Sequence, residues 1–427
     1  MAKFSLLIAF ATLATALLPA HTLAAELPMP VSGAGPAYST TDLAGTWNAS
    51  SLASGPGAPW WERASGTMDS NGSFSGTTME SDGDGGPKTG AFKISPEGII
   101  TPKTGGNDNG FRCGMNATKT VFVCTDTWLD WMRGTTEMKI FTKQAAAYSQ
   151  ADLAGAWAVN GLASGPRAPY WVRGTMTIRP DGTFETSLVD NAGASEDGTG
   201  AIAISSEGLV TLSDRPANEC RMDAGKTLFV CTDTWEDGTA YLMVAARRGN
   251  SYDLADLAGV WEADTLASGA GAPWWERGPV TIKPDGAFSG AVEEYPDSHI
   301  DENWTGTLNI TADGTVTSVG YDSLNCVMDL GKTVMACTAT WSSDPGTSQI
   351  LVFTKRAVSA QVCGDANGDG AATVTDGVQV LRAAAGLSSG CSSGLCDVDG
   401  NGTVSVTDGV NVLRRAAGLP VELRCAF

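Results

Sequence analysis

Short runs of alternating apolar and polar residues fill the chain between residues 38 and 358, as in half-buried β-strands. Turn dipeptides separate the runs at matching places, namely Asn71-Gly72, Asp181-Gly182 and Asp285-Gly286. No helical periodicity is evident before residue 360. The pattern predicts a mainly β region, with roughly six to eight short antiparallel strands per unit in a small barrel or sandwich.

This β pattern occurs three times, in units spanning residues 38–146, 148–250 and 252–358. Each unit opens on Gly-x-Trp and continues through Leu-Ala-Ser-Gly to an Ala-Pro-aromatic-Trp segment that is followed closely by arginine. We expect the first-strand tryptophans to be core residues: Trp47, Trp157 and Trp261. The links between units are short, so the units should sit close together with limited freedom.

Each unit also carries two cysteines that are 11 positions apart. A turn-like segment separates them, and the residues around it, such as Val121 and Phe122, favour strand. We therefore predict a hairpin closed by its own disulfide in every unit: Cys113–Cys124, Cys220–Cys231 and Cys326–Cys337. The chain has 10 cysteines, an even number that favours disulfides in an exported protein.

The paired aromatic residues of each unit allow two interpretations. Adjacent strand residues point to opposite faces, so one ring can be core while the other faces outward or toward a neighbouring unit. An exposed ring beside arginine could stack on a sugar or another flat ligand, whereas the structural alternative is a cation–π contact. The ligand-binding interpretation concerns Trp60, Arg63, Tyr170, Arg173, Trp274 and Arg277.

The Gly-x-Trp motif on the first strand resembles that of lipocalin-like and avidin-like barrels, the calycin group. In those barrels a basic residue from the end of the last strand covers the tryptophan. The resemblance implies this role for Lys143, Arg247 and Lys355. No set of residues matches the biotin site of avidin-like proteins.

Residues 361–427 change character and contain two 12-residue loops rich in aspartate, asparagine and glycine. Their spacing matches EF-hand-type loops, which wrap oxygen ligands around one Ca²⁺. The predicted ligands of two ions are Asp365, Asn367, Asp369, Ala371, Thr373 and Asp376 in the first loop, and Asp397, Asp399, Asn401, Thr403, Ser405 and Asp408 in the second. Short helices are expected at Val378 to Ala385 and Val410 to Ala417.

Loop followed by helix, twice, resembles the duplicated segment of type I dockerins, which bind cohesin domains. The resemblance covers residues 364–419. It implies a partner-binding face made of Val374, Thr375, Leu381, Arg382, Val406, Thr407, Leu413 and Arg414. The alternative is that Leu381 and Leu413 are core residues of a calcium-stabilised fold.

Two features depart from that family. The link from Ser388 to Cys396 is rich in serine and glycine and lacks a clear helix, and four cysteines are added. In a pseudo-twofold pair the end of each helix approaches the start of the other loop. Of three possible connectivities this favours Cys391–Cys396 and Cys363–Cys425.

Composition narrows the function classes further. Residues 1–25 read as a secretory signal peptide, so we expect a secreted or cell-surface protein, and no other stretch is long enough to span a membrane. A formal net charge of −20 disfavours nucleic-acid partners. Only two histidines occur, which argues against histidine-based catalysis or zinc, although not against a carboxylate enzyme.

The sequence thus predicts a non-catalytic binding or assembly protein rather than an enzyme. Three β units would present a surface, while the tail docks to a cohesin-like domain or to another copy in a calcium-dependent way. One alternative is a carbohydrate-binding protein of a polysaccharide-degrading system. Another is a structural protein whose units stack into a surface layer or fibre.

Overall fold

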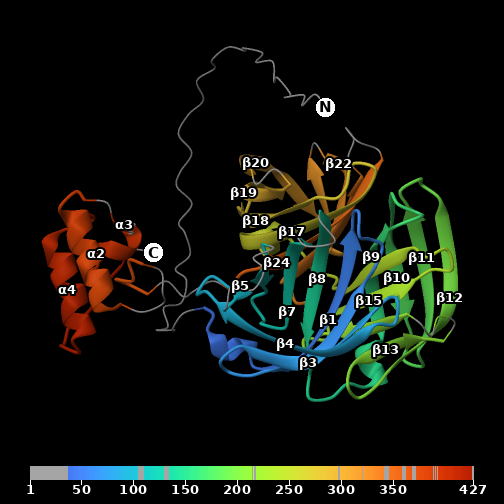
Figure 1. The fold of residues 1–427 in the computed structure, drawn as a ribbon. Coiled ribbons are helices and arrows are strands. Elements are labelled where there is room, and N and C mark those ends of the chain that lie inside the picture. The colour runs from blue at the N-terminus through green and yellow to red at the C-terminus, as the bar shows by residue number, and fades with distance from the viewer. Residues whose placement is uncertain are drawn as a thin grey trace, which may run out of the picture.

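The structure is a computed structural model that describes residues 37–103, 110–128, 134–213, 215, 218–296, 299–319, 321–340, 346–357, 362–367, 372–387, 389, 391 and 393–425. The predicted signal peptide lies outside this part of the chain. Figure 1 shows three β-barrels and a small helical module. In the described residues no helix is long and apolar enough to cross a membrane.

Each unit is a closed barrel of eight antiparallel strands in which the last strand returns to pair with the first. The first barrel contains β1 (Gly45–Ser54), β2 (Glu62–Met68), β3 (Ser73–Glu80), β4 (Gly85–Ile94), β5 (Ile99–Pro102), β6 (Arg112–Met115), β7 (Val121–Trp128) and β8 (Thr135–Lys143). The second contains β9 (Gly155–Ser164), β10 (Tyr170–Ile178), β11 (Thr183–Asp190), β12 (Ser195–Ile204), β13 (Leu209–Leu212), β14 (Glu219–Met222), β15 (Leu228–Thr234) and β16 (Ala240–Arg247). The third contains β17 (Gly259–Gly269), β18 (Trp275–Ile282), β19 (Ala287–Tyr295), β20 (His299–Ile310), β21 (Thr315–Val319), β22 (Tyr321–Met328), β23 (Val334–Thr340) and β24 (Thr347–Lys355).

One turn of helix precedes each barrel and fixes the first-strand tryptophan. These turns are η1 (Thr40–Leu43), η2 (Gln150–Asp152) and α1 (Leu254–Leu257). The buried indole N–H of Trp47 donates to the carbonyl of Leu43 at 2.7 Å, and Lys143 Nζ lies 5.4 Å from the indole centroid. Trp157 with Arg247 and Trp261 with Lys355 repeat this arrangement, as the calycin resemblance implies.

The predicted hairpin disulfides join residues directly opposite each other on neighbouring strands. Cys113 faces Cys124 with 3.9 Å between their Cα atoms, and both side chains are buried in the core of the first barrel. Cys220–Cys231 and Cys326–Cys337 occupy the same position in the other two barrels. The spacing of 11 residues therefore reflects strand register.

The barrels pack side by side in a closed ring. The indole N–H of Trp61 donates to Thr234 of the second barrel, Trp171 donates to Thr340 of the third, and Trp275 donates to Thr127 of the first. A shared apolar core between the barrels contains Leu52, Leu162 and Leu266, all fully buried. The three units are therefore related by a pseudo-threefold axis and form one body, a closer association than short links alone predict.

The same tyrosine contact marks every boundary between units. Tyr148 accepts from the backbone N–H of Ala145 at 2.7 Å, and Tyr252 accepts from Gly249 at 2.8 Å. Tyr38 accepts from Ala357 at 2.7 Å, although this junction joins the third unit back to the first. Burial raises the pKa of each of these tyrosines to about 12.

The C-terminal module contains α2 (Val374–Ala384), α3 (Ser393–Cys396) and α4 (Val406–Ala416). Helices α2 and α4 begin four residues earlier than predicted because Thr373 and Ser405 cap them, with Asp376 and Asp408 as the reciprocal partners in the first turn. The serine- and glycine-rich link does contain a single helical turn, α3. The disulfides are Cys363–Cys425 and Cys391–Cys396, the favoured connectivity.

Candidate functional site

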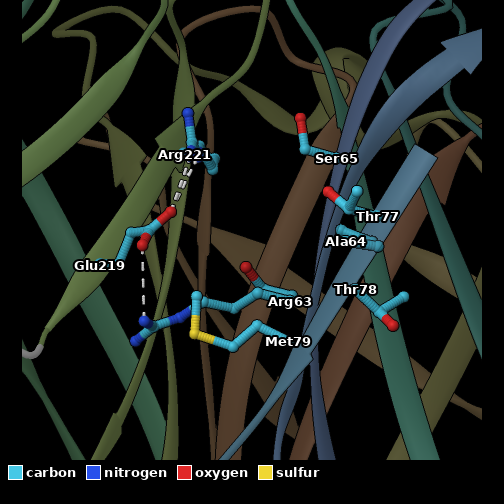
Figure 2. Close-up of a pocket in the computed structure, with 10 residues that line it drawn as sticks. Arg63, Ala64, Ser65, Thr77, Thr78, Met79, Glu219 and Arg221 are labelled. Atoms are coloured by element: carbon cyan, nitrogen blue, oxygen red, sulfur yellow. Dashed lines mark hydrogen bonds and ion pairs between the residues drawn. The ribbon is translucent and has the colours of Figure 1, made fainter. Parts of the chain in front are cut away.

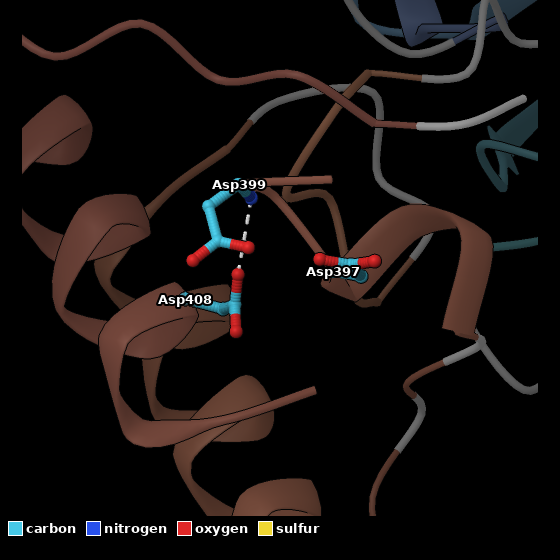
Figure 3. Close-up of side chains that lie close together, drawn as sticks. All are labelled: Asp397, Asp399 and Asp408. Carbon is cyan, nitrogen blue, oxygen red and sulfur yellow. Dashed lines mark hydrogen bonds between the residues drawn. The ribbon is translucent and has the colours of Figure 1, made fainter. Parts of the chain in front are cut away.

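The second predicted calcium loop brings three carboxylates together. Carboxylate oxygens of Asp397, Asp399 and Asp408 all lie within 4.8 Å of one another (Figure 3). Asp408 Oδ1 accepts from the backbone N–H groups of Val398 and Asp399, at 2.9 and 3.1 Å. Its second oxygen accepts from the hydroxyl of Ser405 at 2.7 Å. One carboxylate thus caps α4 and anchors the loop.

The rest of this loop is held by hydrogen bonds between its own residues. Asp397 accepts from the backbone N–H groups of Asn401 and Gly402. Asn401 accepts from the backbone and hydroxyl of Thr403, at 3.0 and 2.6 Å. The loop is therefore folded around its oxygen atoms, with Asp397 and Asp408 buried and Asp399 exposed.

The first loop is described only in part. Asp376 is buried and accepts from the backbone of Asn367 at 3.0 Å and from the hydroxyl of Thr373 at 2.5 Å. Asp365 is also buried. The predicted ligands Asp369 and Ala371 lie outside the described residues. The described half of this loop repeats the contacts of the second loop around its last carboxylate.

The predicted partner-binding residues divide into two groups. Leu381 and Leu413 are half-buried where α2 crosses α4. Each leucine packs against a glycine of the other helix, Leu381 on Gly409 and Leu413 on Gly377, so closely that an added Cβ would lie 2.6 Å from the leucine side chain. The remaining residues of this set are exposed: Val374, Thr375, Arg382, Val406, Thr407 and Arg414. Val378 and Val410, which were not in the predicted set, are exposed one turn after Val374 and Val406. The helices therefore present two similar valine pairs.

The aromatic and arginine residues of the β units lie mainly at the junctions between barrels. Arg63, Arg173 and Arg277 stack on the second aromatic of each pair, with the guanidinium carbon 4.0–4.3 Å from the ring of Trp61, Trp171 or Trp275. Each arginine also donates to a backbone carbonyl of the next barrel: Thr232, Thr338 or Thr125. These arginines join neighbouring barrels.

The first aromatic of each pair is half-buried. Trp60 meets Trp128 edge-on at 5.8 Å, and Tyr170 meets Trp235 in the same way at 5.5 Å. Trp274 is half-buried as well. The predicted pairing of an exposed aromatic with the nearby arginine is therefore not what the structure shows, since the arginine covers the other ring.

A buried charged cluster occupies the first barrel beside Trp128. Lys139 Nζ lies 2.6 Å from Glu62 and 3.3 Å from Glu137, whose other oxygen accepts from the Trp128 indole at 3.3 Å. Burial, reinforced by the charge of Glu137, raises the pKa of Asp126 to about 7. Burial alone would lower the pKa of Lys139, but the charges of Glu137 and Glu62 raise it. Equivalent positions hold different residues in the other barrels, for example Met243 and Leu351 in place of Lys139.

Two pockets lie between barrels. A depression of about 350 Å³ surrounds the pseudo-threefold axis where the three Ser-Gly loops meet. Each unit contributes similar residues there, and the close fit of Gly55 on Pro273 and of Gly165 on Pro59 explains their repetition by packing. The second pocket, of about 210 Å³, lies between the first and second barrels and has no symmetric counterpart in sequence.

This second pocket, called the junction pocket below, is lined by β1, β2 and β3 of the first barrel and by β14 of the second. Figure 2 shows Arg63 and Arg221 on either side of Glu219. Arg221 Nη2 lies 2.7 Å from one oxygen of Glu219, and Arg63 Nη1 lies 3.5 Å from the other. Burial is the main cause that lowers the pKa of Arg63.

Sequence reasoning missed both the charged cluster and the role of Glu219 and Arg221. The repeat itself carried the signal, because Lys139 and Arg221 stand at positions where the other two units have uncharged residues. Positions beside the first hairpin cysteine are Arg112 and Gly114, Glu219 and Arg221, and Asn325 and Val327. Residues that all three units share are explained by the common barrel fold, whereas residues found in one unit only are candidates for a specific site.

The fold and sites together define a mainly β protein, in which a pseudo-threefold ring of barrels is followed by a helical module with paired acidic loops. No protein-family model and no curated protein matches the chain. Similarity to solved structures is weak, as the following comparisons show.

Transferrin binding protein B from serogroup B Neisseria meningitidis has 10% identity and a TM-score of 0.27, over 70% of this chain and 66% of that one. A mutant of this protein from Haemophilus parasuis has 9% identity and a TM-score of 0.27, with the same coverage. A protein of unknown function from the DUF3598 family of Nostoc punctiforme has 11% identity and a TM-score of 0.18, over 49% of this chain and 99% of that one. None of these likenesses is close enough to assign a function.

Proposed function

We propose that this is a secreted, non-catalytic binding and assembly protein whose C-terminal module docks to a protein partner in a calcium-dependent way. The observation that carries the proposal is the gathering of Asp397, Asp399 and Asp408 at the start of an exposed, valine-bearing helix pair. The three-barrel ring is then the body that the module attaches to its partner.

The residues of the second loop fit Ca²⁺. Calcium is a hard cation that takes six to eight oxygen ligands, and carboxylate, amide and hydroxyl oxygens all occur here. Asp397 and Asp408 are buried, and in the described part of the chain no lysine or arginine forms an ion pair with either. Since buried charge without a counter-charge is costly, a bound cation would stabilise the loop. Asp397, Asp399, Asn401 and Asp408 would hold it, with the first loop as a second site.

The exposed valines favour a protein partner over a small ligand. Val374 is 59% exposed and Val378 is 48% exposed on α2, while Val406 and Val410 are 61% and 44% exposed on α4. Aliphatic side chains grouped on two short helices are typical of interaction surfaces. Because α2 and α4 carry nearly the same face, the module has two equivalent faces for a cohesin-like domain.

A second candidate function is carbohydrate binding by the ring of barrels. The structure favours it less than the sequence did, because Arg63, Arg173 and Arg277 are committed to junctions and the paired aromatics are half-buried. A structural role in a layer or fibre is also less favoured, because the ring is closed and the contact surfaces of each barrel are already occupied by the other two barrels. Neither catalytic role nor cofactor chemistry is part of the proposal.

The test uses the full chain with a panel of purified cohesin-like domains, in excess calcium and in chelator. We expect binding in calcium, loss of binding in chelator, and two bound ions by calorimetric titration. The double variant Val378→Asp with Val410→Asp should keep calcium binding and lose the partner. Val319→Asp is the matched control, since Val319 is an exposed valine, 60% accessible, on the third barrel. No binding to any domain of the panel in calcium, with both ions bound, would contradict the docking proposal.

A further inference from the structure

The junction pocket holds two arginines in a protein that is otherwise strongly acidic. Among its described lining residues the charged ones are Arg63, Arg221 and Glu219, and the nearby carboxylate of Asp233 also interacts with the charge of Arg63. The whole chain has a formal net charge of −20. Arg221 is thus a local cation on a surface that otherwise repels anions, and it can attract an anion into the pocket.

Arg221 has unused hydrogen-bonding capacity toward this pocket. Its Nε and Nη2 atoms both donate to one oxygen of Glu219, at 3.2 and 2.7 Å. Its Nη1 atom meets no acceptor in the described part of the chain. The guanidinium is about a fifth exposed, with 22% of the side chain accessible, so it is open to a ligand yet held in place by Glu219. A fixed guanidinium with free N–H groups suits a carboxylate or another oxyanion.

The opposite wall of the pocket offers hydroxyl groups. Ser65 and Thr77, which pair across β2 and β3, lie on the same face as Arg63, with Met79 beside Arg63 (Figure 2). Hydroxyls both donate and accept, so they can bind the hydroxyl groups of a polar ligand. The volume of about 210 Å³ is below the usual range for drug-sized ligands and suits a small molecule.

The other two junctions keep the same scaffold but not the pair formed by Glu219 and Arg221. Arg173 replaces Arg63 between the second and third barrels, but Asn325 and Val327 replace Glu219 and Arg221. Between the third and first barrels, Arg112 and Gly114 stand at the positions of Glu219 and Arg221. There Arg112 pairs with Glu262, whose side chain packs against Gly114 and fills the space that Arg221 occupies at the first junction. Ring assembly therefore does not need Glu219 and Arg221, and their presence at one junction requires another explanation.

We propose that the junction pocket binds a small organic anion that carries hydroxyl groups, such as a uronic acid. Arg221 holds the carboxylate, and Ser65 and Thr77 contact the hydroxyls. Glu219 orients both arginines and reduces the local positive charge. This site is on the ring of barrels and does not depend on calcium or on docking by the C-terminal module.

The test is calorimetric titration of the full chain with galacturonate, galactose and sulfate. We expect saturable binding of galacturonate, with at least about tenfold weaker binding of galactose, because a charge-assisted hydrogen bond contributes on the order of a factor of ten. Arg221→Ala should weaken galacturonate binding by a similar factor. Chelation of calcium should leave this binding unchanged.

Arg173→Ala is the control for an effect on the ring, since it removes the counterpart of Arg63 at the junction where Asn325 and Val327 replace Glu219 and Arg221. Equal weakening by Arg173→Ala and Arg221→Ala would overturn the proposal, because the effect would then come from the ring as a whole. The absence of saturable galacturonate binding would also overturn it. Equal binding of sulfate and galacturonate would overturn the acidic-sugar assignment by showing that hydroxyl contacts contribute nothing. Circular dichroism of each variant checks that the barrels are intact.

Discussion

Removal of one hydroxyl at a junction between barrels provides a sharp test of the closed ring. Trp275 reaches from the third barrel to the first, and its indole N–H donates to Thr127 Oγ1 at 2.7 Å. Both residues are almost fully buried, at 3% and 2% exposed. Thr127→Val keeps the shape of the side chain and removes the acceptor. The indole N–H is then buried without a partner, which costs about 1–3 kcal/mol.

Urea unfolding of the full chain, followed by tryptophan fluorescence, measures this cost from the shift in midpoint at unchanged slope. Thr234→Val removes the equivalent acceptor for Trp61, but Thr234 is exposed, so water can replace the hydroxyl and the loss should be smaller. Thr89→Val on the exposed surface is the control and should stay within about 0.5 kcal/mol of the parent. Equal stability of Thr127→Val and the parent would refute the reasoning, as would separate unfolding of the third barrel.

Three further predictions test the charged groups. Burial raises the pKa of Asp223 to about 6. Protonation of Asp223 therefore stabilises the folded state fully below its unfolded pKa near 4, and this stabilisation is lost as pH rises through about 6. Asp223→Asn, which imitates Asn116 of the first unit, should flatten the rise in urea midpoint on acidification between about pH 7.5 and pH 4.5. Lys139→Met should destabilise the first barrel by about 3–5 kcal/mol, because buried Glu137 loses its cation and buried Glu62 keeps only the exposed Lys88. Adding Glu62→Val, the residue of the second barrel, should recover part of this loss in thermal or urea unfolding. Asp408→Asn should reduce the calcium stoichiometry from two ions to one in calorimetric titration and leave barrel unfolding unchanged, whereas two ions bound by the variant would contradict the assignment of the second loop.

The sequence predicted the units because the repeat supplied three readings of one pattern. The hairpin disulfides, the basic residues over Trp47, Trp157 and Trp261, and the mainly β class all depend on contacts between residues close in strand register. Such contacts leave a fixed spacing in the chain. The choice of a closed barrel over a sandwich was not settled by spacing, because alternation specifies a buried face and not how the sheet closes.

The ring and its junction pocket were beyond the reach of pattern reasoning. The hydrogen bond from Trp61 to Thr234 joins residues 173 positions apart, and no local periodicity encodes that pairing. The start of α2 was placed too late because Thr373 and Asp376 were read as cation ligands, although they also form a helix cap. Residues with two roles are the ones that a single motif describes incompletely.

The tyrosine contact at the unit boundaries has a consequence for chain order. Tyr38 meets Ala357 with the same geometry that Tyr148 and Tyr252 use where the backbone itself continues. The backbone of the ring is continuous at two boundaries between units and interrupted at the third, yet the tyrosine hydrogen bond is the same at all three. The chain of the ring could consequently begin at any of the three boundaries. A circular permutant that opens at Tyr148, with residue 357 joined to residue 38 by a short linker, would keep all three barrels and their contacts. It would also move the point at which another domain is attached to a different position around the axis.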